Sequence, residues 1–182
     1  MKTLVIHPKD RSTTFLEVIY KDIEDKTVIT VGVTKAEIIN LIESHDRVMI
    51  MGHGSPYGLF NTYGFNCMDS YIIDNTMVEV LSKKDNSVFI WCNADQFVNK
   101  HQLKGFYSGM FISERGEAYY CGLPGTKQEV VDESNYGFVD IVAECINETV
   151  EVIHSTVKEK YGKLAEENPV ALYNNNRIYL NR

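Results

Sequence analysis

A histidine and a cysteine each follow an apolar segment of this chain, close to the point where that segment ends. His53-Gly54 comes after residues 47–51, and Cys92-Asn93 comes after residues 87–91. A cysteine that acts as a nucleophile needs a neighbour that accepts and returns its proton, and an imidazole can do both. The two residue pairs therefore indicate thiol chemistry, on the condition that folding brings the two side chains to one place.

The segments before the two pairs have the length and composition of buried strands in an α/β sheet. Residues 74–81 lie between them and begin with a helix-start signal at Asp74. A strand, a crossover helix and a second parallel strand place both strand ends on the same edge of a sheet. We therefore expect the His53 imidazole and the Cys92 thiol to face each other at that edge.

The remaining sequence alternates between strand and helix patterns. Strands are expected at residues 3–6, 27–31 and 106–112, helices at 15–20 and 113–121, and short strands or loop at 58–73. Thr34 with Glu37, and Thr126 with Glu129, form two capping boxes that start helices. From Phe138 apolar residues continue at helical spacing to residue 161, which predicts one long helix that ends at Gly162. The tail, residues 169–180, is expected to be extended.

This alternation predicts a three-layer α/β/α sandwich with a mostly parallel central sheet. No linker or internal repeat divides the 182 residues, so we expect a single domain over residues 1–182. In open sheets of this kind, ligands bind beyond the carboxyl ends of the strands, which is where His53 and Cys92 are expected.

The composition, with 44% hydrophobic and 24% charged residues, is that of an ordinary globular protein. A net charge of −7 without a basic cluster argues against a nucleic-acid partner. The four cysteines lack framework spacing and are expected to be free thiols in a reducing compartment. Without a signal peptide or a run that could span a membrane, a cytoplasmic location is expected. No metal and no cofactor are expected, because no His or Cys pair has ligand spacing and no phosphate-binding glycine motif is present.

The sequence Met49-Ile50-Met51-Gly52-His53-Gly54 resembles the strand-then-His-Gly motif of the caspase-haemoglobinase fold, the group of caspases, legumains, clostripains, gingipains and CHAT proteases. The sequence Val88-Phe89-Ile90-Trp91-Cys92-Asn93 is similar to the second motif of that group, an apolar strand that ends in the nucleophilic cysteine. The resemblance covers the first two thirds of the chain. The Gln-Ala-Cys signature of true caspases is absent. Trp91 stands before the cysteine, where small residues are usual in the group, and Asp95 stands where related families often have Gly or Ala.

The resemblance implies a cysteine endopeptidase that acts on polypeptides. Cys92 would attack the peptide carbonyl, His53 would protonate the leaving amine, and the backbone amides of Gly54 and Cys92 would form the oxyanion hole. A helix that starts just after Cys92 would also lower the pKa of its thiol. The loop after the first strand would select the substrate side chain, and it carries both Asp10 and Arg11, so the sign of that preference stays open.

Two other classes of function stay open. One is a catalytically inactive caspase-like domain, a pseudo-protease or interaction module, in which Cys92 only fills a strand end. The other is a flavodoxin-like cofactor binder.

His7 also ends a strand and is a minor rival of His53, but Pro8 after it offers no amide for an oxyanion hole. The other cysteines, Cys67, Cys121 and Cys145, are interpreted as structural.

Overall fold

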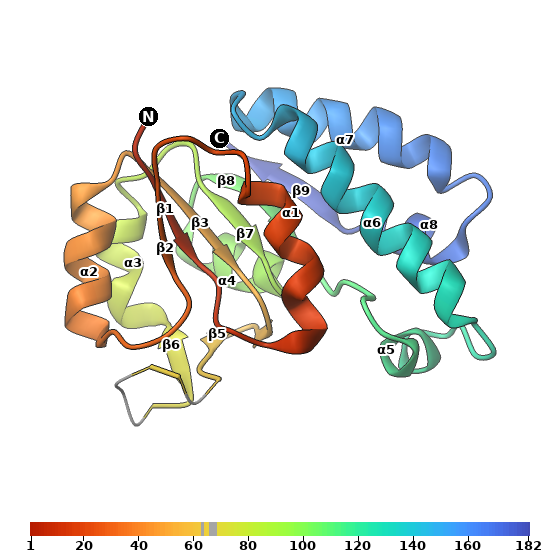
Figure 1. Ribbon diagram of the computed structural model, residues 1–182, viewed down its shortest axis with the longest axis horizontal. Coiled ribbons are helices and arrows are strands. Elements are labelled where there is room, and N and C mark those ends of the chain that lie inside the picture. The colour runs from red at the N-terminus through yellow and green to blue at the C-terminus, as the bar shows by residue number, and fades with distance from the viewer. Residues whose placement is uncertain (63, 66–68) are drawn as a thin grey trace.

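A six-stranded sheet with helices on both faces forms the centre of the computed structural model, which describes residues 1–62, 64–65 and 69–182 (Figure 1). The strand order is β2-β1-β3-β7-β8-β9. The strands span β1 (Thr3–Ile6), β2 (Lys26–Ile29), β3 (Arg47–Met51), β7 (Val88–Ile90), β8 (Gly105–Ser108) and β9 (Ile178–Asn181). All neighbours are parallel except β8 and β9, which are antiparallel. The α/β class and the mostly parallel sheet predicted from the sequence are thus confirmed.

Helices cover the two faces of the sheet in two groups, which makes three layers (Figure 1). One face carries α2 (Lys35–Ser44), α3 (Val78–Leu81) and α4 (Ala94–His101), which bury their apolar residues against it in one core. The other face carries α1 (Glu17–Tyr20), α6 (Gln128–Cys145) and α7 (Val150–Leu164) around a second core. Two 3-10 helices, η1 (Arg11–Leu16) and η2 (Asn75–Met77), precede α1 and α3. The first crossovers therefore deliver β1, β3 and β7 in parallel, with their carboxyl ends at one edge.

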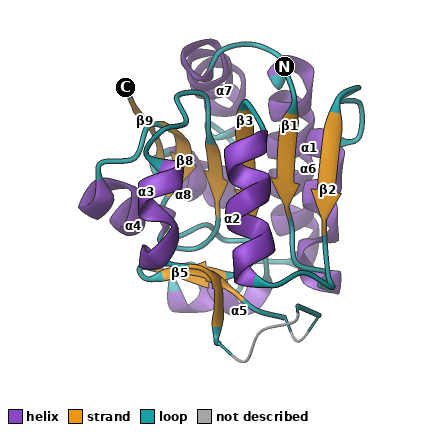
Figure 2. Cartoon of the chain, turned by 90° about the vertical axis from the view of Figure 1, so that its left-hand side faces the viewer, coloured by secondary structure: helices purple, strands orange, loops and turns teal. Residues whose placement is uncertain are grey.

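A small antiparallel sheet lies beside that edge, below the ends of β1 and β2 in Figure 2. It consists of β4 (Gly54–Ser55), β5 (Gly58–Phe60) and β6 (Tyr71–Ile73). The irregular pattern of residues 58–73 predicted short strands or loop here, and among the described residues the structure has short strands. Cys67, interpreted as structural, lies outside the described residues.

The first predicted capping box is present. The Thr34 hydroxyl accepts from the amide of Glu37, whose carboxylate accepts from the amide of Thr34 in return. The second prediction is wrong. Lys127 is the N-cap of α6, and the Thr126 hydroxyl instead donates to the carbonyl oxygen of Leu123.

The prediction of one long helix up to Gly162 is also wrong, because the chain turns between α6 and α7 after Cys145. Both helices bury their apolar faces in the same core, so apolar residues recur at a similar spacing before and after the turn. The sequence pattern therefore does not reveal the turn. Gly162 lies inside α7. The tail is only partly extended, since Asn168 caps α8 (Pro169–Asn175) before β9 begins.

The predicted strand at 106–112 ends earlier, at Ser108. The loop that follows leads to α5 (Arg115–Tyr120), and Asn174 of α8 holds this loop through two hydrogen bonds. Its Oδ1 accepts from the Ile112 amide at 2.7 Å, and its Nδ2 donates to the Ile112 carbonyl at 2.9 Å. Among the described helices, none is long and apolar enough to cross a bilayer.

Candidate active site

His53 and Cys92 lie at the carboxyl edge of the sheet, one after β3 and the other after β7. These two strands are adjacent and parallel, with Met51 opposite Ile90. Both residues line one narrow cavity of about 20 Å³, together with residues of η1 and of the loop before α5. The crossover argument therefore placed the two residues correctly at a shared edge.

The imidazole of His53 is bonded to the loop after β1. Its Nε2 lies 2.7 Å from the Ser12 hydroxyl oxygen and 3.7 Å from Oδ1 of Asp10. The Ser12 hydroxyl also donates to the same Asp10 oxygen at 2.5 Å, and the Ser12 amide does so at 2.9 Å. These hydrogen bonds from Ser12 lower the pKa of Asp10 below its usual value. Asp10, predicted to bind substrate, is thus occupied as the N-cap of η1.

His7 is buried at the end of β1 and is bonded on both ring nitrogens. Nδ1 lies 2.9 Å from the Tyr20 hydroxyl, and Nε2 lies 3.1 Å from the Thr13 hydroxyl. Burial lowers the pKa of His7 to about 4. Its contacts fix η1 against α1, so the position that rivalled His53 in the sequence has a structural role.

The thiol of Cys92 has its hydrogen-bond partners in the loop before α5 and in α5, and not at the His53 imidazole that was expected to face it. Its sulfur lies 3.6 Å from the Phe111 carbonyl oxygen and 3.8 Å from Oε1 of Glu117. Burial, and then the negative charge of Glu117, raise the pKa of Cys92 to about 12. The expectation that the helix after Cys92 lowers this pKa is wrong for this conformation, because desolvation and a carboxylate outweigh the helix dipole. Between these two described residues, Cys92 and His53, no hydrogen bond is present.

Glu117, like Ser12, is a residue of the site that the sequence patterns did not indicate. Its Oε2 accepts from the amide and hydroxyl of Ser113 at 2.7 and 2.9 Å and from the Glu114 amide at 3.1 Å. Glu117 therefore caps the start of α5 with one oxygen and contacts the thiol with the other. An acidic residue at the third position of a short helix is the sequence signal for the cap. No comparable pattern indicates the contact with Cys92, since that depends on how the loop folds back.

Trp91, the bulky residue before the cysteine, is buried and is one of the residues that line the narrow cavity. Its indole NH donates to the Ser55 carbonyl at 3.1 Å, which fixes β4 to the end of β7. A β-carbon on Gly54 would lie 2.2 Å from Cδ1 of this indole and 2.7 Å from the Gly58 carbonyl oxygen. Gly54 is thus required by packing against Trp91, and it is not among the residues that line the narrow cavity. The oxyanion role of its amide stays a prediction.

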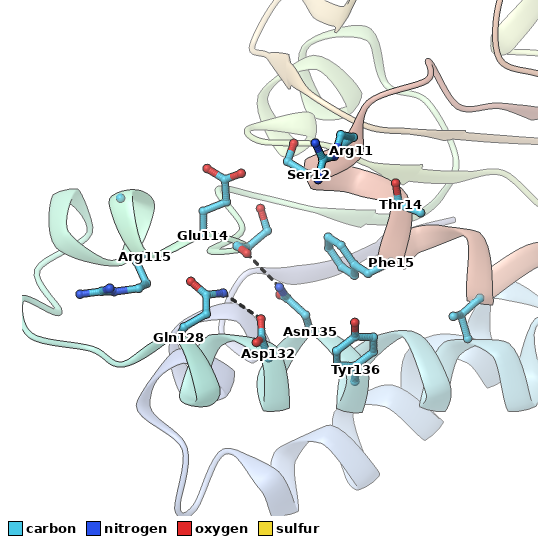
Figure 3. Close-up of a pocket in the computed structure, with 13 residues that line it drawn as sticks. Arg11, Ser12, Thr14, Phe15, Glu114, Arg115, Gln128, Asp132, Asn135 and Tyr136 are labelled. Atoms are coloured by element: carbon cyan, nitrogen blue, oxygen red, sulfur yellow. Dashed lines mark hydrogen bonds between the residues drawn. The ribbon is translucent and has the colours of Figure 1, made fainter.

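A wider cavity of about 680 Å³ adjoins the narrow one between η1, α5 and α6 (Figure 3). Phe15 and Ser113 line both cavities. The charged residues that line the wider cavity are Arg11, Arg115, Glu114 and Asp132. Arg11, predicted to bind substrate, does line this space, and residues of both signs are present, so the charge preference of the cavity stays open.

In the part of the chain that the structure describes, no group of three His, Cys, Asp or Glu residues is arranged to hold a metal ion. Cys92, Cys121 and Cys145 are free thiols.

No family model matches the sequence, and no curated protein does. Among solved structures, a chain of the RcsB response regulator of Salmonella typhimurium aligns over 94% of this chain and 95% of its own, with 13% identity and a TM-score of 0.33. A similarity this low supports no conclusion on fold or function.

Proposed function

We propose that this chain is a cysteine peptidase of the caspase-haemoglobinase type, with Cys92 as nucleophile and His53 as its proton carrier. The observation that supports it best is the shared narrow cavity at the ends of two adjacent parallel strands. A histidine after one strand and a cysteine after the next is the arrangement that the sequence resemblance implies. The free thiols fit a reducing compartment, and we propose the cytoplasm.

In the proposed reaction, His53 takes the thiol proton and the Cys92 sulfur forms a bond to the peptide carbonyl carbon. The carbonyl oxygen becomes an oxyanion, which the amides of Gly54 and Cys92 would stabilise. The C–N bond then breaks as His53 returns the proton to the leaving amine. A water molecule, deprotonated by His53, hydrolyses the thioester and releases the carboxylate product.

The described conformation has to change before this reaction can proceed. A cavity of about 20 Å³ holds no peptide, and a thiol with a pKa of about 12 is protonated at neutral pH. We propose that substrate enters along the wider cavity, displaces the Phe15 and Ser113 walls, and frees the thiol from Glu117. On this proposal Arg11 would contact an acidic substrate side chain.

A second candidate is a catalytically inactive member of the same fold. The contact between Cys92 and Glu117 favours it, because a carboxylate beside the sulfur opposes the thiolate that catalysis needs. The two candidates differ in whether a peptide changes the reactivity of Cys92.

A library of peptidyl acyloxymethyl ketones, varied at P1, separates them. Such a probe forms a bond from its methylene carbon to the thiolate sulfur and expels a carboxylate, and mass spectrometry locates the adduct. The peptidase predicts labelling of Cys92 that depends on the peptide and is lost in His53→Ala. Arg11→Ala should then weaken labelling by probes with an acidic P1 residue only.

The inactive domain predicts that no peptide probe labels Cys92 faster than it labels the half-buried Cys121, and that His53→Ala changes nothing. Iodoacetamide, which carries no peptide, is the control reagent. Labelling of Cys92 that is no faster than that of Cys121 and is unchanged in His53→Ala would reject the peptidase proposal.

A further inference from the structure

The Ser12 hydroxyl stands between a carboxylate and an imidazole, which allows its proton to be assigned. The hydroxyl oxygen lies 2.5 Å from Oδ1 of Asp10 and 2.7 Å from Nε2 of His53. Both distances are those of good hydrogen bonds. A serine hydroxyl has one proton to donate, so only one of the two bonds can use it.

The protonation state of Asp10 determines which of the two bonds uses the hydroxyl proton. Two bonds from Ser12 lower the pKa of Asp10, so its carboxyl group is ionised at neutral pH and can only accept. Ser12 therefore donates its proton to Asp10 and accepts the second bond from His53. It follows that Nε2 of His53 carries a proton. A neutral imidazole has a single ring proton, so Nδ1 is then the nitrogen with a free lone pair.

We propose that Ser12 and Asp10 are positioning residues that hold His53 in its Nε2-protonated form, so that Nδ1 is the nitrogen that exchanges a proton with Cys92. Only the last step, the exchange with Cys92, rests on the proposed function. Neither residue touches the reacting atoms. Both act through the orientation and protonation of the imidazole.

Two contacts hold the segment that carries Ser12 in place. Asp10 caps η1 through the Ser12 amide, and the next residue, Thr13, is bonded to the buried His7. His7 is in turn bonded to Tyr20 of α1. A side chain fixed in this way can select one ring form of its neighbour, whereas a mobile surface serine would follow the imidazole.

The same pair would stabilise the imidazolium that forms when His53 takes the thiol proton. Asp10 lies 3.7 Å from Nε2, and the positive charge would be shared with it through the Ser12 hydroxyl. The other titratable groups around His53 are His7, at the end of β1, and Cys92, after β7. His7 is neutral near pH 7, so Asp10 supplies the charge that faces the ring.

Two-bond ¹⁵N–¹H correlation spectra of protein labelled with ¹⁵N-histidine test the assignment without any substrate. We expect His53 to give the pattern of the Nε2-protonated form above pH 8. Ser12→Ala should produce a mixture of the two ring forms, and Ser12→Thr should restore the wild-type pattern. Thr14→Ala removes a hydroxyl of η1 that donates to the Asp10 carbonyl, and should change nothing. An Nδ1-protonated ring in the wild type, or an unchanged pattern in Ser12→Ala, would overturn the inference.

The rate of Cys92 labelling by the best peptidyl probe, measured from pH 5 to 9, tests the last step. Ser12→Ala should reduce the rate on the order of 10-fold and change the shape of its pH profile, while Ser12→Thr should recover both. If the ring form changes in Ser12→Ala but labelling does not, the tautomer assignment holds and the use of His53 as proton carrier is rejected.

Discussion

The sulfur of Cys92 lies 3.8 Å from one carboxylate oxygen of Glu117, while the other oxygen caps the first turn of α5. One acidic side chain thus keeps the thiol protonated and also caps a helix, so both properties depend on the same residue. As long as α5 keeps this position, Cys92 is a hydrogen-bond donor. Any reaction at the sulfur begins with the loss of this contact.

Glu117→Gln should make Cys92 more reactive. The substitution removes the negative charge but keeps an oxygen that can accept from the Ser113 and Glu114 amides, so the pKa of Cys92 should fall. Each unit of that fall gives about 10-fold more thiolate at pH 8. Site-resolved mass spectrometry of iodoacetamide adducts measures the rate. Glu129→Gln, at an exposed position in the first turn of α6, is the control, and equal rates in both variants would contradict the contact.

Gly54→Ala should destabilise the fold by about 1–3 kcal/mol, because the new methyl group would collide with the Trp91 indole and with the backbone of Gly58. Urea-induced unfolding gives the change in the free energy of unfolding. Gly116→Ala is a matched control in α5, where a β-carbon meets nothing within 4 Å, and it should be neutral or stabilising by up to about 1 kcal/mol. A neutral result at Gly54 would mean that the indole does not pack there.

His7 should make stability depend on pH below neutrality. Its pKa is about 4 in the folded chain against 6.5 as the reference value, so the unfolded chain takes up a proton as the pH falls through 6.5 and the folded chain does not. Stability that is present above pH 6.5 is therefore lost toward pH 4, by about 2–4 kcal/mol. The difference in free energy of unfolding between the wild type and His7→Gln, followed from pH 7.5 to 4.5, should shrink over this range. A difference that stays constant with pH would contradict a buried neutral histidine.

Asn174→Ala should cost several kcal/mol, since it leaves the amide and the carbonyl of Ile112 buried without partners, at about 1–3 kcal/mol for each. The loop that it releases also supplies the Phe111 carbonyl to Cys92. We expect a lower urea midpoint together with faster alkylation of Cys92. Asn176→Ala, exposed at the end of α8, should leave both quantities unchanged.

The strands of the sheet and the edge that carries His53 and Cys92 could be predicted from the sequence, because both follow from local apolar patterns and from the handedness of crossovers. The partners of the two side chains could not. Ser12 in η1 and Glu117 in α5 reach them from short helices whose positions depend on tertiary contacts, such as the bonds of His7 to Thr13 and of Asn174 to Ile112. The turn between α6 and α7 was missed for a different reason, since apolar spacing does not register a change of direction when both helices face the same core.

α5 lies apart from the layered body of the molecule, at its lower right in Figure 1. It is attached through a small separate cluster that includes Ala118, Val131 and Val170 and shares no residue with the two main cores. Replacement of this short segment is therefore expected to change the reactivity of the sulfur more than the folding of the sandwich. The charge that controls the thiol is thereby carried by a stretch of chain that lies outside the two main cores.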